Sequence, residues 1–189
     1  VELVFRDKAA NVSSSPLVKF TVPTINCASS TPTYLSDLVP TSSINGFGPV
    51  EMDQSNGFYN ANDGTTLKIN IQSFAKGIGV HAISEIEFNV APSAKNTFST
   101  TIGIDDEVGD LGTAVFKIYK DNVLSFTSGV LSGNGPSQNV SLDITGTQVL
   151  KLRVEDGGDN ISHDHGDWAD AKIYTACINP DSVAPSLFS

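Results

Sequence analysis

The sequence predicts an all-β protein built as an antiparallel β-sandwich. Three observations lead to this fold class. Seven segments alternate apolar and polar residues with a period of two, which is typical of strands that bury one face and expose the other. Gly, Asn, Asp, Ser and Pro separate these segments. No segment carries the apolar stripe of an amphipathic helix, so the alternating strands are expected to form two packed sheets.

The expected strands have similar lengths and lie in the middle and C-terminal parts of the chain. They are KINIQSF (68–74), SEIEFNV (84–90), TFSTTIGI (97–104), AVFKIYK (114–120), VLSFTSG (123–129), QNVSLDI (138–144) and QVLKLRV (148–154). ADAKIY (169–174) is expected to form a further strand. Asp121 and Asn122 occupy the position of a two-residue hairpin turn.

Composition and charge restrict the classes of partner. The chain has 189 residues, of which 39% are hydrophobic, enough for one full-sized domain and a short appendage. Its 21 acidic and 11 basic residues give a formal net charge of -10, which disfavours a nucleic-acid partner. No apolar run approaches the roughly 18 residues that a membrane-spanning helix needs. The chain starts at Val1 without a signal-peptide pattern, so we expect its numbering to begin inside a longer protein.

The N-terminal residues 1–23 differ from the rest. They offer a strand, a turn-rich DKAANVSSS and a second strand, and they resemble the last two strands of an immunoglobulin-like repeat. Because two strands cannot bury a core, this hairpin either belongs to a preceding domain or pairs with a neighbouring subunit. Residues 24–33 are expected to be a linker, 34–178 the β-sandwich, and 179–189 a second linker.

The two cysteines, Cys27 and Cys177, flank the strand-rich region. In a sandwich whose first and last strands are neighbours, this placement suits a disulfide that closes nearly the whole domain. Two buried free thiols are the alternative.

Two segments concentrate acidic and aromatic side chains at strand ends. FSTTIGIDDEVGD (98–110) places Asp105, Asp106 and Glu107 directly after a strand, and DHGDWADAKI (164–173) places two acids, a His and the single Trp before another. Acids at this density repel one another unless they bind a cation, a polyol or hydrogen-bond donors. The function is therefore expected at these loops.

From Tyr34 to about Ile178 the sequence resembles the NPCBM family, bacterial carbohydrate-binding modules of family 51 with a galactose-binding-like β-sandwich. The matching pieces occur in the family's order: YLSDL, NGFGPVEMDQSNG, AKGIGVHAISEIEF, FSTTIGIDDEVG, GTAVFKIYKDNV, SGVL and DHGDWADAKI. The resemblance implies a non-catalytic jelly-roll module tethered to a glycoside hydrolase or a surface protein, with galactose-type glycans as ligands and a structural calcium ion. The family usually carries Trp where this chain has Phe47, whose smaller ring offers less face for a sugar.

The expected carbohydrate-binding residues lie in loops that the resemblance places near strand ends. They are His81, Asp105, Asp106, Glu107, Asp164, His165 and Trp168. Each has a structural alternative: His81 can anchor its loop, the three consecutive acids can form a solvated turn, and Trp168 can be a core aromatic. At most two of those three acids are expected to converge on one ligand, because successive side chains of an extended segment point to opposite faces.

Oxygen-rich turns supply the expected calcium ligands, Asp53, Asn56 and Asp63, with Ser55 beside them and Asp170 from the last strand. A cluster of hydrogen-bonding turn caps is the alternative. The triplet His163, Asp164 and His165 also suggests zinc, but neighbouring residues of an extended segment point to opposite faces.

We therefore expect a lectin-like module, not an enzyme, that is secreted or displayed on a bacterial surface. The alternative is a structural repeat of an extracellular adhesin or filament that has lost sugar binding, which the N-terminal hairpin and Phe47 favour. The paired carboxylates could serve a glycosidase, but no nucleophile elbow or zinc signature accompanies them.

Overall fold

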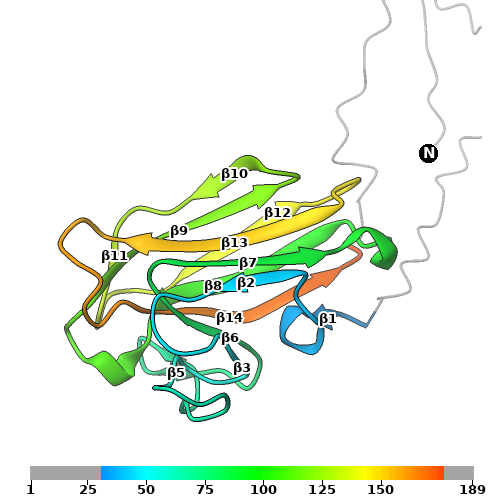
Figure 1. Cartoon of the computed structure of the whole chain (residues 1–189). Coiled ribbons are helices and arrows are strands. Elements are labelled where there is room, and N and C mark those ends of the chain that lie inside the picture. The colour runs from blue at the N-terminus through cyan, green and yellow to red at the C-terminus, as the bar shows by residue number, and fades with distance from the viewer. Residues whose placement is uncertain (1–30, 177–189) are drawn as a thin grey trace, which may run out of the picture.

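The computed structural model describes residues 31–176, which form two antiparallel sheets packed face to face (Figure 1). The expected N-terminal hairpin 1–23, both cysteines and the C-terminal linker 179–189 lie outside the described residues, so these calls stay predictions. Within the described part, no helix is long and apolar enough to cross a membrane.

The described chain contains fourteen strands and three short 3₁₀ helices. In chain order they are β1 (Thr33–Tyr34), η1 (Leu35–Asp37), β2 (Ser42–Ile44), β3 (Glu51–Met52), β4 (Lys68–Ile69), β5 (Gln72–Ser73), β6 (Gly77–His81), β7 (Ser84–Asn89), η2 (Ala91–Ser93), β8 (Thr97–Ile104), η3 (Asp106–Val108), β9 (Thr113–Lys120), β10 (Val123–Thr127), β11 (Leu131–Ser132), β12 (Gln138–Asp143), β13 (Val149–Asp156) and β14 (His165–Tyr174).

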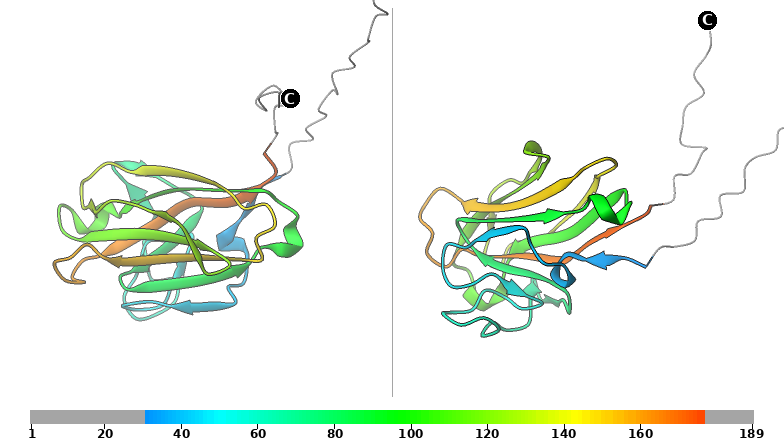
Figure 2. Two further views of the ribbon diagram at one scale, coloured as in Figure 1. Left: turned by 90° about the horizontal axis from the view of Figure 1, so that it is seen from above. Right: turned by 45° about the vertical axis from the view of Figure 1, so that its right-hand side comes forward.

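The first sheet has the order β12-β8-β14-β6-β3, with β1 added to β14. The second has the order β10-β9-β13-β7-β2, with β11 added to β9. Both are antiparallel, which confirms the predicted sandwich. The two views in Figure 2 show the start of β1 and the end of β14 at the same end of the sandwich, where Thr33 pairs with Ile173.

The core lies between the sheets and follows the alternation of the sequence. In β13, Leu150, Leu152 and Val154 are fully buried while the residues between them are partly exposed. From the opposing sheet Trp168 meets Phe116 edge to face, with ring centroids 5.0 Å apart. Burial of large apolar side chains from both sheets is the main stabilising contribution.

Two parts of the strand prediction are wrong. Residues 68–74 form a small hairpin, β4 and β5, because Asn70 and Ile71 adopt positive φ and turn the chain back. Residues Gly77–His81 form an inner strand, β6, that alternation could not identify because all five residues are buried. The turn predicted at Asp121 and Asn122 is confirmed, since both have positive φ and Lys120 pairs with Val123.

The loop 53–57 packs directly on β6 because Gly79 has no side chain. A Cβ atom at Gly79 would lie 2.3 Å from the carbonyl oxygen of Gln54 and 2.6 Å from the backbone nitrogen of Asn56. Backbone atoms cannot move aside as a side chain can. Gly79 therefore fixes how closely this loop approaches the sheet.

We expect Gly79→Ala to lower the free energy of unfolding by about 1–3 kcal/mol, the usual cost of overpacking a tight contact. Urea unfolding measures the change. Gly129→Ala is the matched control, because a Cβ atom there would meet nothing within 4 Å. Equal stability of the two variants would contradict the role of Gly79.

Candidate functional site

A pocket of about 710 Å³ opens at the end of the sandwich where β14 begins. Its volume lies in the range of pockets that bind small molecules. The pocket is formed by the ends of β6 and β14 together with loops that follow β2, β3, β8 and β13. Its lining residues are Gly46, Phe47, Asn56, Phe58, His81, Glu107, Val108, Leu111, Ile161, Ser162, His163 and His165.

Two histidines from neighbouring strands form one wall. His81 ends β6 and pairs with His165, the first residue of β14, and their rings meet edge to face at 5.3 Å. The Nδ1 atom of His81 lies 2.7 Å from the carbonyl oxygen of Ala82. A carbonyl can only accept, so Nδ1 carries the proton and Nε2 is an acceptor. Burial, partly opposed by the Ala82 hydrogen bond, lowers the pKa of His81.

Glu107 supplies the carboxylate of the pocket. Asp105 caps η3 by accepting a hydrogen bond from the Glu107 backbone N–H, which sets the direction of the Glu107 side chain. The Oε1 atom of Glu107 lies 2.6 Å from Nδ1 of His165, and Oε2 accepts a hydrogen bond of 2.9 Å from Ser55. Burial alone would raise the pKa of Glu107, but the hydrogen bonds from His165 and Ser55 outweigh it and hold the pKa below its usual value.

An aromatic ring faces the histidines. The Phe47 ring centroid lies 5.8 Å from that of His81 and 5.4 Å from that of Tyr59. The Asn45 side chain holds this loop, because its Nδ2 donates to the carbonyl of Phe47 at 2.8 Å and its Oδ1 accepts from the backbone N–H of His81 at 2.7 Å. Asn45 thus joins the Phe47 loop to the strand that carries His81.

The remaining rim is apolar and exposed. Phe58, Leu111 and Ile161 are 69%, 49% and 45% exposed, and all three line the pocket. Exposed apolar side chains gathered around one opening are typical of a binding surface. The sequence offered no local signal for these residues, because none of them belongs to an alternating apolar segment.

The structure brings three of the seven expected binding residues into the pocket, namely His81, Glu107 and His165. Asp105 is buried and accepts from the backbone N–H of Lys68 as well as that of Glu107. Asp106 accepts from the backbone N–H groups of two residues in the β4–β5 turn, Asn70 and Ile71, both at 2.8 Å. These two acids therefore satisfy backbone donors of the neighbouring hairpin.

Asp164 and Trp168 lie beneath the surface. Trp168 has no exposed surface and packs in the core, as its structural alternative expected, so its ring has no free face for a sugar. Asp164 is also fully buried; Oδ1 accepts from the backbone N–H of Thr113, whereas Oδ2 has no partner in the described part of the chain. Burial raises the pKa of Asp164 to about 6.

The residues expected to bind calcium already have protein partners. Asp53 accepts from Nζ of Lys76 at 2.6 Å, and Asp170 meets Nζ of Lys172 at 2.5 Å. Asp63 caps three backbone N–H groups of its own turn. Oδ1 of Asn56 accepts from the Asn45 side chain. Within residues 31–176, no three His, Cys, Asp or Glu side chains are grouped to hold a metal ion.

The chain matches a family model and several known proteins. Residues 31–174 match the NPCBM/NEW2 domain. A putative endo-alpha-N-acetylgalactosaminidase of Renibacterium salmoninarum is 37% identical over 158 residues, and an alpha-1,3-galactosidase B of Akkermansia muciniphila is 30% identical over 125 residues. The matches cover 82% and 65% of this chain but only 10% and 15% of these relatives.

Solved structures show the same sandwich. A CBM51 module from a Clostridium perfringens GH95 protein, solved in complex with methyl-galactose, is 37% identical with a TM-score of 0.69; the match covers 76% of this chain and 99% of that one. A structure from Clostridium perfringens ZmpB that contains CBM51-2 in complex with GlcNAc is 31% identical, also with a TM-score of 0.69, over 78% of this chain and 32% of that one.

The raised pKa of Asp164 predicts a pH-dependent effect on stability. Between pH 4 and 6 the folded protein retains a proton that the unfolded chain releases, so this group costs stability as the pH rises through that window. We expect Asp164→Asn to raise the melting temperature at pH 7.5 and to have little effect at pH 4. The size of the gain should be on the order of 2 kcal/mol.

Thermal unfolding of both proteins across this pH range provides the measurement. Asp110→Asn, at an exposed position, is the control. Its melting temperature should equal that of the wild type at every pH. A gain for Asp164→Asn that is the same at pH 4 and pH 7.5 would exclude ionisation as its cause.

Proposed function

Because the chain belongs to the NPCBM/NEW2 domain family, we propose that it is a non-catalytic carbohydrate-binding module whose pocket holds a galactose-type residue of a glycan. The observation that carries this proposal is the convergence of His81, Glu107 and His165 on one wall of an open pocket, with Phe47 beside them. The similarity to a module solved with methyl-galactose supports the choice of sugar.

The wall chemistry suits sugar hydroxyls. His81 donates through Nδ1 to the carbonyl of Ala82 and keeps Nε2 as an acceptor. His165 likewise uses Nδ1 toward Glu107, which leaves its Nε2 for a ligand. Two acceptors on adjacent rings match two hydroxyl groups on neighbouring sugar carbons. The Phe47 face can cover the apolar C–H face of the ring, although less of it than an indole would cover.

The pocket does not supply the groups that glycoside hydrolysis needs. Most glycosidases use two carboxyl groups about 5–9.5 Å apart, on either side of the scissile bond. Glu107 is the single carboxylate among the residues lining this pocket, and it is tied to His165 and Ser55. The enzyme names of the relatives describe chains of which this sequence covers a small part. We therefore assign recognition rather than catalysis to the module.

The location and attachment of the module follow from the same proposal. We infer that it works outside a bacterial cell, as part of a larger glycoside hydrolase or surface protein, and holds that protein near its glycan. The adhesin or filament repeat without sugar binding is the alternative, and the sugar titration below separates the two.

We also propose that a calcium ion stabilises the fold. The support is a polar hollow beside Asp53, lined by Gln54, Thr65 and Thr66, all of which carry side-chain oxygens that Ca²⁺ accepts as ligands. Oε1 of Gln54 is buried without a hydrogen-bond partner in the described part of the chain. Asp53 would have to share its carboxylate between the ion and Lys76.

For sugar binding, we expect methyl-galactose to bind the full chain with a Kd of about 0.1–1 mM, roughly 4–5.5 kcal/mol. Glu107→Gln and His165→Ala should each weaken binding at least tenfold in a calorimetric or NMR titration, because each removes or misplaces part of the polar wall.

Glu155→Gln is the matched control, since Glu155 pairs with Lys117 on β9 of the other sheet. The affinity of Glu155→Gln for methyl-galactose should equal that of the wild type. If the wild type does not respond to methyl-galactose or GlcNAc at tens of millimolar, the adhesin-repeat alternative replaces the lectin function.

For calcium, excess chelator should lower the melting temperature by several degrees, because an ion that binds only the native state stabilises it. Readdition of Ca²⁺ should restore the original value, and Mg²⁺ at the same concentration is the control. An unchanged melting curve, with no calcium in elemental analysis, would remove calcium from the proposal.

A further inference from the structure

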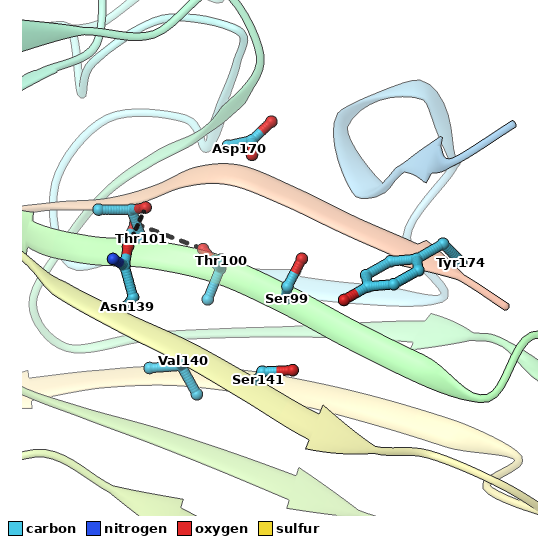
Figure 3. Close-up of a pocket in the computed structure, with 8 residues that line it drawn as sticks. All are labelled: Ser99, Thr100, Thr101, Asn139, Val140, Ser141, Asp170 and Tyr174. Carbon is cyan, nitrogen blue, oxygen red and sulfur yellow. Dashed lines mark hydrogen bonds between the residues drawn. The ribbon is translucent and has the colours of Figure 1, made fainter. Parts of the chain in front are cut away.

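A second hollow lies on the outer face of the first sheet, away from the pocket beside His81, Glu107 and His165, which we call the loop-end pocket. It has a volume of about 240 Å³ and crosses β12, β8 and β14. Figure 3 shows Ser99 and Thr101 from β8, Asn139 and Ser141 from β12, and Asp170 and Tyr174 from β14 around it. The pairing explains the grouping, because Ser141 lies opposite Ser99 and Asn139 opposite Thr101. We call this the sheet groove.

A bulge in β14 shapes the groove. The register of β14 against β8 shifts between Ala169 and Lys172, and Asp170 adopts a φ of 53° within the bulge. The Asp170 backbone N–H donates to the carbonyl of Lys76 at 2.7 Å, which fixes the bulge against β6. Such bulges redirect side chains and often adjoin functional sites. Here the bulge brings a carboxylate to the edge of the groove (Figure 3).

The groove offers hydrogen-bonding groups that the protein itself leaves unused. In the described part of the chain, the hydroxyl groups of Ser99, Ser141 and Tyr174 form no hydrogen bond within the protein, and neither does Oδ1 of Asp170. The other lining groups are in use: Thr101 donates to Asn139 at 2.8 Å, Thr100 donates to the carbonyl of Ala169 at 2.9 Å, and Oδ2 of Asp170 accepts from Nζ of Lys172. The Tyr174 ring closes one end of the hollow, with its hydroxyl turned toward Ser99 (Figure 3).

This combination fits a neutral polyol better than other ligands. Hydroxyl groups can both accept from and donate to vicinal sugar hydroxyls, a carboxylate can accept from them, and an aromatic ring can lie against the apolar face of a sugar. The net charge of -10 disfavours sulfated or sialylated glycans. The small side chains leave space for an extended glycan to lie along the sheet. A pocket that binds a single sugar does not need that space.

We propose that the sheet groove is a second, weaker saccharide-binding site that takes an internal part of a neutral glycan or a neighbouring glycan chain. His165 and Asp170 are five residues apart on β14, about 17 Å at the usual rise of a strand, so one sugar cannot occupy both sites. One protein molecule could then bind a dense glycan layer at two points. Binding at two points raises the apparent affinity without a new contact in the loop-end pocket.

The test uses the full chain and a neutral galactose-terminated tetrasaccharide, followed by amide chemical shifts. We expect shifts at residues 99–101 and 139–141 that persist in Glu107→Gln, where the loop-end pocket is disabled, and that disappear in Tyr174→Ala. Because the readout is local to the groove, a failed loop-end pocket and a failed sheet groove give different results.

Binding to a surface that carries many copies of the tetrasaccharide is the second measurement. Tyr174→Ala should weaken it about tenfold while the affinity for free methyl-galactose stays unchanged. Tyr119→Ala is the matched control, because Tyr119 stands on the other sheet and packs under Nζ of Lys151. Ser99→Leu, which fills the groove without removing the aromatic ring, should reproduce the loss. Unshifted groove amides at saturating tetrasaccharide, or equal surface binding by Tyr174→Ala and wild type, would overturn the proposal.

Discussion

The backbone pairing of β14 is the constraint on which both candidate surfaces depend. This strand is hydrogen-bonded to β6 and β8 along its length and to β1 near its end. Its first residue, His165, stands in the loop-end pocket, whereas Tyr174, its last, closes the sheet groove. His165 pairs with His81 of β6 and Tyr174 with Thr97 of β8, so the backbone at neither residue can shift without loss of ladder hydrogen bonds. The distance between the two surfaces is therefore fixed by the strand itself.

Buried carboxyl groups hold the loop that completes the pocket. Asp105 accepts backbone N–H groups from the β4–β5 hairpin and from η3, and Asp167 lies behind it in β14 between Gly79 and Gly103. Burial raises the pKa of both acids, and the charge of Asp105 raises that of Asp167 further. The carboxylate of Asp105 is thus used for structure. Glu107, two residues further on, instead accepts from Ser55 and meets His165 at the pocket wall.

The alternation of apolar and polar residues was enough to predict those strands that expose one face. Residues 97–104 and 149–154 alternate cleanly, and they form the paired strands β8 and β13. Alternation failed for β6, where Gly77 and Gly79 are covered by other backbone and every residue is buried. It also failed at Ile71, which alternates as a strand residue should but turns the chain at positive φ because Asp106 captures its N–H. Contacts far along the chain decided both cases.

The sequence by itself determined the fold class, the family and several of the loops that line the candidate pocket, because periodicity and motif order are local properties. Tertiary structure decided which side chains in those loops face outward. Trp168 and Asp164 are near His165 in sequence, yet strand alternation and sheet packing bury them. Leu111 and Ile161 carry no motif, and they line the pocket because loops fifty residues apart meet at one end of the sandwich. Whether a side chain is buried or exposed depends on what packs against its strand, and the local sequence does not contain that information.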